Sequence, residues 1–150
     1  MTRTKNELVP ILFRYFMVAS LMRQEFDEHL NNHSEQAAIG GDPTAIVVSK
    51  GWIKMCLWYG MLFVVVEGWR QAQLSDPEID QLLASPNTEL LRRFRNGMFH
   101  FQEDQWLPSK LSDFFAPSNK TVDWVRALTK AFRRYLLAEM NRISPPLVAP

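Results

Sequence analysis

The stretch Met55-Cys56-Leu57-Trp58-Tyr59-Gly60-Met61-Leu62-Phe63-Val64-Val65-Val66 is continuously apolar and bounded by Lys54 and Glu67. A bilayer span needs about twenty such residues, so this run is too short for one. The valines would suit a strand locally, but the length and the flanking pattern favour a helix. We therefore predict a central helix from about Pro43 to Gln73, either continuous or broken near Gly51, that is apolar all round because other helices cover it.

The segments on either side of this run are expected to be those covering helices. Apolar residues recur at steps of three and four, and Thr4 and the sequence Ser75-Asp76-Pro77-Glu78 are helix start signals. Thr121 or Asn119 is expected to cap the last helix. The predicted helices span residues 5–31, 77–84, 90–101, 109–115 and 121–142. The fold class is all-α, an up-and-down bundle of four to five main helices over 1–143, followed by a flexible Pro-rich tail over 144–150.

Composition limits the class of protein. The chain has 150 residues, enough for one compact domain, with 47% hydrophobic and 22% charged residues, which excludes a disordered chain. A net charge of +1 is low for a protein that wraps duplex nucleic acid. The single cysteine, Cys56, is expected to fill the core. Because the sequence has no Cys/His cluster at the spacing of a zinc site, we predict no metal and no cofactor. The N-terminus does not resemble a signal peptide, so we predict a cytoplasmic protein without membrane association.

The segment Leu90 to Phe101 carries the candidate site. Wound as a helix, it has one apolar stripe that faces the core, formed by Leu90, Leu91, Phe94, Met98 and Phe101. The opposite arc carries Arg95, Asn96, Phe99 and His100. Asn96 and His100 are one turn apart, so their side chains are expected to touch. A guanidinium, an amide and an imidazole would therefore converge on one helix face.

Arg95-Asn96-Gly97-Met98-Phe99-His100 resembles the motif of HEPN domains, in which a His follows an Arg and a polar residue. The HEPN superfamily consists of small helical bundles, and many of its members are metal-independent endoribonucleases. The resemblance is specific over these six positions, and elsewhere only the helical character agrees. It implies a homodimer in which two motifs face a shared cleft, with RNA as the substrate and a cyclic phosphate as the product.

The three polar residues suit RNA cleavage without a metal. An imidazole such as that of His100 serves as base or acid near neutral pH. Arg95 offers a positive fork that suits phosphate oxygens, and Asn96 would orient the imidazole or the phosphate. We predict that these three residues are catalytic.

Three further residues are assigned around this group. Phe99 and Arg92 are placed in a substrate-binding or dimer cleft, where Phe99 packs across a two-fold interface or stacks on a base. Glu67 is a candidate orienting carboxylate that holds Arg95 or accepts a hydrogen bond from His100. The more ordinary interpretation of Glu67 is a structural ion pair or a solvent-facing helix end.

Two other features have alternative interpretations. Gly97 inside a helix suggests close approach of another backbone or of a ligand, or a simple bend. The last helix carries Arg126, Lys130, Arg133 and Arg134 on its outer surface. Such a surface is usually just solvated, but it would be an RNA-phosphate track if it lay beside the motif helix. His33, in a polar connection, is expected to be solvated.

Three classes of function remain open from the sequence. The first is a metal-independent endoribonuclease, a toxin or defence component with RNA as substrate and an antitoxin protein as a possible partner. The second is a non-catalytic helical module that binds RNA, nucleotide or protein through the same cleft. The third is a helical enzyme of unrelated chemistry, for which no nucleophile–base pair or phosphate loop is visible.

Overall fold

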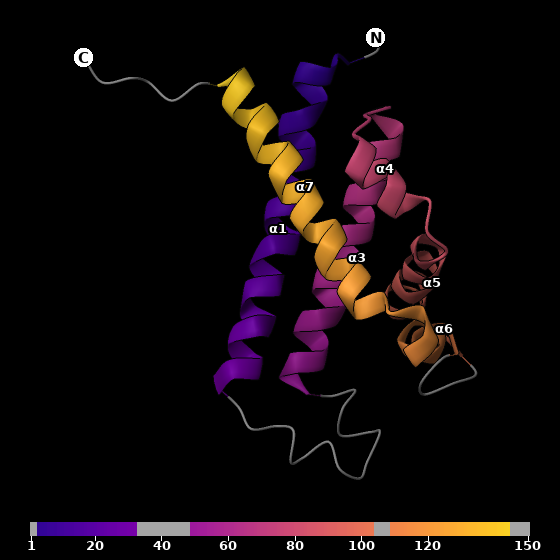
Figure 1. Ribbon diagram of the computed structural model, residues 1–150. Helices are drawn as coiled ribbons and strands as arrows, with labels where there is room; N and C mark the ends of the chain where they lie inside the picture. The colour runs from indigo at the N-terminus through magenta and orange to yellow at the C-terminus, as the bar shows by residue number, and fades with distance from the viewer. Residues whose placement is uncertain (1–2, 33–48, 104–108, 145–150) are drawn as a thin grey trace.

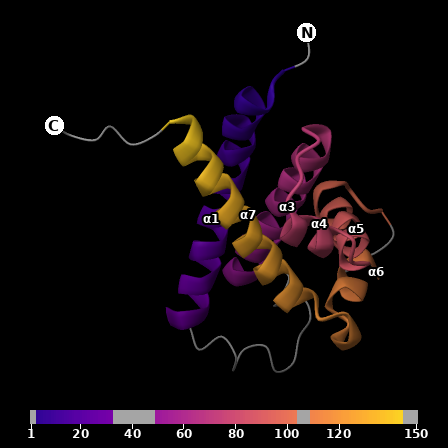
Figure 2. The same cartoon turned by 45° about the horizontal axis from the view of Figure 1, so that its top comes forward.

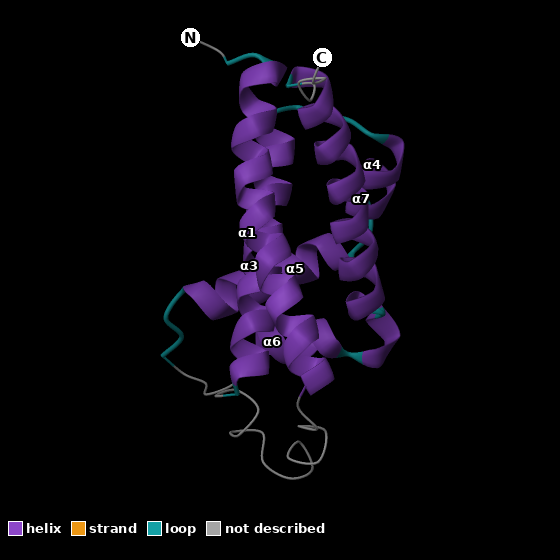
Figure 3. Cartoon of the chain, turned by 90° about the vertical axis from the view of Figure 1, so that its left-hand side faces the viewer, coloured by secondary structure: helices purple, strands orange, loops and turns teal. Residues whose placement is uncertain are grey.

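The computed structural model describes residues 3–32, 49–103 and 109–144, and every regular element within them is a helix (Figure 1, Figure 3). The predicted all-α bundle is confirmed. The predicted connection with His33 and the tail from residue 145 lie outside the described residues. The elements are α1 (Lys5–Asn32), α3 (Lys50–Gln71), α4 (Pro77–Leu83), α5 (Asn87–Phe99), α6 (Ser109–Ser112), the 3-10 turns η2 (Asp113–Phe115) and η3 (Pro117–Asn119), and α7 (Thr121–Ile143).

The central helix is α3, as the apolar run predicts. It begins at Lys50, where the Ser49 hydroxyl accepts a hydrogen bond from the Trp52 N–H at 3.1 Å, and residues 43–48 of the predicted helix lie outside the described residues. Its length and composition alone would allow it to cross a membrane, but 56% of its most apolar window is buried inside the protein. Buried side chains therefore lie on several sides of α3, since other helices cover it.

Helix α1 packs against both α3 and α7 and runs antiparallel to α7 (Figure 1, Figure 2), while α7 meets α3 through large side chains such as Trp69 and Phe132. Arg142 of α7 donates to the Asn6 side chain at one end of this pair, and Arg126 donates to Asp27 at the other. Gly68 lets α1 approach α3, because a Cβ there would lie 2.6 Å from Cδ1 of Leu12. This packing fixes which residues of α1 face α7.

The start of α7 differs from the prediction. The N-cap is Lys120, in the left-handed region with φ 48°, and no side chain caps the helix. Thr121 is buried instead, and its hydroxyl donates to the Phe114 carbonyl at 2.6 Å. The Asn119 amide donates to the Asp113 carbonyl. Thr121 therefore ties η2 to α7 and Asn119 ties η2 to η3, because a carbonyl of η2 competes with the helix end for each side chain.

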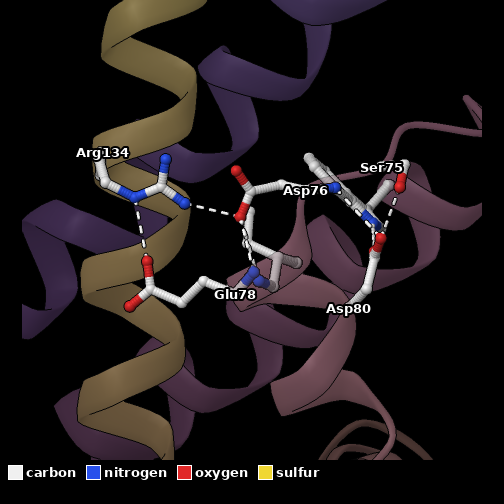
Figure 4. Close-up of polar contacts among 7 residues, drawn as sticks. Ser75, Asp76, Glu78, Asp80 and Arg134 are labelled. Atoms are coloured by element: carbon white, nitrogen blue, oxygen red, sulfur yellow. Dashed lines mark hydrogen bonds and ion pairs between the residues drawn. The ribbon is translucent and has the colours of Figure 1, made fainter.

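A polar cluster joins the start of α4 to α7 (Figure 4). Asp76 caps α4 by accepting hydrogen bonds from the backbone N–H groups of Glu78 and Ile79, both at 3.2 Å. Arg134 reaches across from α7 and donates to Asp76 at 2.6 Å and to Glu78 at 3.0 Å. Burial alone would raise the pKa of Asp76, but the Arg134 and backbone hydrogen bonds outweigh it and lower that pKa. Asp76 therefore stabilises the fold in its ionised form.

Replacing Asp76 with Asn tests this linkage. Asn keeps the helix cap but loses the charge, so Asp76→Asn is expected to cost less than about 1 kcal/mol at pH 7. A lowered folded-state pKa gives stability above the unfolded value of about 3.9, which is lost as pH falls through the folded value. Urea unfolding at pH 7, 4 and 2.5 should show the two proteins converging on acidification. A difference that stays constant across this range would contradict the account.

Candidate functional site

Helix α5 is held against α3 by one fully buried ring. Phe94 is 0% exposed, and its ring centroid lies 5.6 Å from that of Tyr59 and 5.0 Å from that of Phe114. Trp52 and Phe115 complete the aromatic cluster, with centroids 6.4 and 5.8 Å from that of Phe94. Aromatic pairs of this kind contribute beyond their buried area. The next residue along α5 is Arg95, so this cluster fixes the base of the candidate site.

The motif helix ends earlier than the sequence pattern predicts. α5 stops at Phe99, and His100 is its C-cap with φ −115° and ψ 134°, although its N–H still donates to the Asn96 carbonyl at 3.1 Å. Leu91 is buried and Met98 packs against the core as predicted. The prediction that Phe101 faces the core is wrong, because the extended backbone carries it off the helical stripe and leaves it 89% exposed.

Gly97 makes room for another helix. A Cβ at this position would lie 3.3 Å both from Cβ of Lys110 and from Cδ2 of Leu111, so α6 packs directly on the motif helix. Lys110 also donates to the Gln102 side chain at 2.9 Å, beyond the end of α5. Of the interpretations left open for Gly97, close approach of a second element is the one observed.

Arg95, Asn96 and Glu67 form one polar group. Nη1 of Arg95 donates to Oδ1 of Asn96 at 3.1 Å, and Nη2 lies 3.9 Å from Oε2 of Glu67 on α3. The second contact is long and partly exposed, so it contributes at most about 1 kcal/mol. It agrees with the prediction that Glu67 holds Arg95, and also with an ordinary structural ion pair.

Among the described residues, no hydrogen bond joins the side chains of Asn96 and His100, which were expected to touch. Once α5 ends at Phe99, the His100 side chain no longer follows the helical face, and Oδ1 of Asn96 accepts from Arg95 instead. His100 is exposed, and its imidazole has no hydrogen-bond partner in the part of the chain that the structure describes. The imidazole is thus available to solvent or to a ligand.

Arg92 is exposed and pairs with Glu89 one turn earlier on α5. It takes no part in the polar group around Arg95. No contact within the described part of the chain therefore supports the assignment of Arg92 to a cleft, and this assignment stays a prediction.

A hollow of about 440 Å³ lies beside the polar group, between α1 and α3. Glu67 is part of its wall and also faces Arg95, so the hollow and the motif share one residue. Arg3, Tyr15 and Gln71 line it as well. These three were not predicted as site residues, because Arg3 and Tyr15 come near Glu67 only through the packing of α1 on α3, while Gln71 lies one turn after Glu67 on α3 itself.

Other reactive groups lie apart from this site. Burial raises the pKa of the Cys56 thiol to about 12, so it is not a thiolate nucleophile at neutral pH. Within residues 3–32, 49–103 and 109–144, no three His, Cys, Asp or Glu side chains gather in a way that would hold a metal ion. The chemistry of this region therefore depends on Arg95, Asn96, His100 and their neighbours.

Phe99 lies against α3, not wholly on the far side of the helix as predicted. A Cβ on Gly60 would overlap the Phe99 ring, with Cζ 2.7 Å away, and yet Phe99 is 50% exposed. The glycine therefore seats Phe99 next to the motif and leaves one side of the ring uncovered.

A double-mutant cycle tests this seat. Alanine is a better helix former than glycine by about 1 kcal/mol, so Gly60→Ala should stabilise a Phe99→Ala protein by about that amount. In the wild type, part or all of the gain should be lost because the ring is displaced. Chemical denaturation should give a coupling of at least about 0.5 kcal/mol. Equal effects of Gly60→Ala in both backgrounds would show that the ring does not occupy this seat.

Comparisons with known proteins add no further assignment: no family model, no curated protein and no solved structure matches this chain significantly.

Proposed function

We propose that the protein is a metal-independent endoribonuclease of HEPN type that acts as a homodimer. The proposal rests on the side chains that the structure places at the end of α5. There the Arg95 guanidinium and the Asn96 amide join, and the exposed His100 follows with an imidazole that no described residue engages. A guanidinium and a free imidazole carried by the same helix end are the groups that metal-independent phosphodiester cleavage needs.

The proposed reaction is attack by the ribose 2′-oxygen on the adjacent phosphorus. His100 takes the 2′-hydroxyl proton, the bond to the 5′-oxygen breaks, and an acid gives that oxygen a proton. The products are a 2′,3′-cyclic phosphate and a free 5′-hydroxyl. Arg95 stabilises the charge that develops on the phosphorane oxygens, while Asn96 keeps the guanidinium oriented. A second subunit would supply the second imidazole, acting as the acid.

Exposed aromatic rings favour such a pairing of subunits. Phe99 is 50% exposed and Phe101 is 89% exposed, on either side of His100. Neighbouring exposed apolar rings mark a contact surface in a protein or a stacking surface for bases. We place RNA and the second subunit on this surface.

A toxin or defence role, with an antitoxin protein as partner, follows if cleavage is harmful to the cell. Induced expression tests it, because the wild type should arrest growth and His100→Ala, expressed to the same level, should not. RNA recovered from arrested cells should carry 2′,3′-cyclic phosphate ends. Equal growth arrest by both proteins would contradict an active site at His100.

A non-catalytic binding module is the second candidate. It is favoured by one observation: Arg95 already has partners in Asn96 and Glu67, as expected of a structural arginine. This function predicts that RNA, nucleotide or protein binding survives His100→Ala and that purified wild type cleaves no RNA.

A further inference from the structure

A second cluster of polar side chains lies between α1 and α7. These two helices contact each other, as both views of the ribbon show (Figure 1, Figure 2). The hollow there has a volume of about 220 Å³. Four cationic side chains and two hydroxyl side chains line it: Arg23, Arg126, Lys130, Arg133, Ser20 and Thr129. The candidate site at the end of α5 shares none of these residues.

The charges in this hollow are not balanced by the protein. Asp27 pairs with Arg23 at 2.7 Å and with Arg126 at 3.0 Å. Lys130 and Arg133 have no ion-pair partner in residues 3–32, 49–103 or 109–144. Four cations and one carboxylate leave a local charge of +3 (4 − 1 = 3). Such like charges repel one another, so a bound anion would lower the free energy of this arrangement.

Two groups in the hollow are prepared for an anion. The Arg126 guanidinium is fixed by Asp27 and by the face of the Trp58 ring, whose centroid lies 5.5 Å away. Ser20 is only 9% exposed, and its hydroxyl has no hydrogen-bond partner among the described residues. The Thr129 hydroxyl is already engaged, since it donates to the Val125 carbonyl. The Ser20 hydroxyl has no partner in the described part of the chain and faces a hollow lined by four cations, which points to an acceptor-rich ligand.

The ligand can extend into a larger apolar groove. A neighbouring hollow of about 550 Å³ shares Ser20 and Arg133 with the cationic one. Its walls include exposed apolar side chains of both helices: Met17 at 49%, Val18 at 44%, Leu21 at 53% and Leu137 at 40% exposure. The cationic end and the apolar groove together describe an amphiphilic anion.

We propose that the cationic hollow binds the phosphate of a phosphate monoester whose apolar body lies in the adjoining groove. A phosphate monoester carries close to two negative charges at pH 7 and offers three acceptor oxygens, which matches this excess of cations better than a single carboxylate does. The hollow is smaller than the roughly 300–1,000 Å³ typical of a whole-ligand site, so it takes the phosphate group and leaves the body to the groove. This inference does not depend on ribonuclease activity.

Isothermal titration with inorganic phosphate and with hexyl phosphate tests the cationic hollow. Lys130→Gln/Arg133→Gln should weaken the binding of both probes at least tenfold. The control Lys50→Gln/Arg70→Gln removes two exposed cations of α3 and so the same net charge, and should leave both affinities unchanged. If both double variants lose affinity equally, the phosphate probes are attracted only by the net charge of the protein, and the proposal is overturned.

Replacing an apolar wall separates the two parts of the ligand. Leu21→Ser should weaken hexyl phosphate at least threefold and leave inorganic phosphate unchanged. Phosphatidylcholine vesicles containing phosphatidic acid distinguish a lipid from a soluble ester. Vesicle binding that hexyl phosphate displaces assigns the site to a lipid headgroup, and hexyl phosphate binding alone assigns it to a soluble ester. Absence of binding by both soluble probes would overturn the proposal, with or without vesicle binding.

Discussion

Replacing His100 with alanine is expected to lower the rate of RNA cleavage by about 10²- to 10⁴-fold, the usual contribution of a positioned general acid or base. The imidazole is exposed, has no described partner and follows the helix that carries Arg95 and Asn96. Little else should change, because His100 is exposed and its side chain makes no hydrogen bond or ion pair among the described residues. Single-turnover cleavage of a labelled RNA measures the rate, and thermal unfolding checks that the fold is intact.

Replacing Arg95 tests the role of its guanidinium in the same cleavage assay. Arg95→Ala should lose a comparable factor, while Arg95→Lys should keep the charge, lose the bidentate geometry and fall between the two. Arg70→Ala removes an exposed arginine of α3 that makes no described ion pair, and should cleave at the wild-type rate. If Arg95→Ala and Arg70→Ala cleave equally fast, the guanidinium of Arg95 is not part of the reaction.

Replacing Phe94 with alanine is expected to cost about 3–5 kcal/mol of folding free energy, the range for removing a fully buried aromatic ring. Phe94 is 0% exposed and lies at the centre of rings from α3, α5 and η2, so no neighbour can fill the space without losing its own contacts. Urea unfolding followed by far-UV circular dichroism gives the free energy.

Phe101 supplies the control for Phe94. The two side chains are chemically identical, seven residues apart and 0% and 89% exposed. Measured at a protein concentration at which the subunits are dissociated, Phe101→Ala should change stability by less than about 0.5 kcal/mol, because a surface ring loses little on truncation. A similar cost at both positions would mean that α5 is not anchored through Phe94.

Most of the fold follows from apolar spacing and start signals. The apolar run around Trp58 predicts the central helix, and Asp76-Pro77 predicts the start of α4, because both signals are local. The cap of α7 is mispredicted, since the Thr121 hydroxyl donates instead to the Phe114 carbonyl of η2, which the fold of the preceding turns brings to the helix end. Sequence spacing contains no information about that competing partner.

The candidate site is predictable in its composition and less so in its geometry. The contact of Arg95 with Asn96 joins adjacent residues, and the approach of Glu67 was among the alternatives stated from the sequence. The position of His100 was not predictable from periodicity, since a helical pattern that continues past Phe99 places it on the wrong face. Helix ends depend on cap geometry and on what packs beside them, here α6 on Gly97.

The α1–α7 surface shows the same limit. The stripe Arg126, Lys130 and Arg133 is visible in the sequence as a basic helix face. Ser20 and Arg23 join it only because α1 runs antiparallel to α7, and the motif helix α5 contributes no residue to this hollow. An RNA-phosphate track was expected only if the basic face lay beside the motif helix, and the hollow that these residues line contains no residue of α5.

Cleavage of end-labelled RNA in excess EDTA tests the central claim most directly. The purified wild type and its His100→Ala variant are compared at equal concentration, with folding checked for both. A metal-independent nuclease at this motif predicts undiminished cleavage by the wild type, 2′,3′-cyclic phosphate ends and loss of cleavage in the variant. Cleavage that stops in EDTA, or that persists in His100→Ala, would contradict the proposed function.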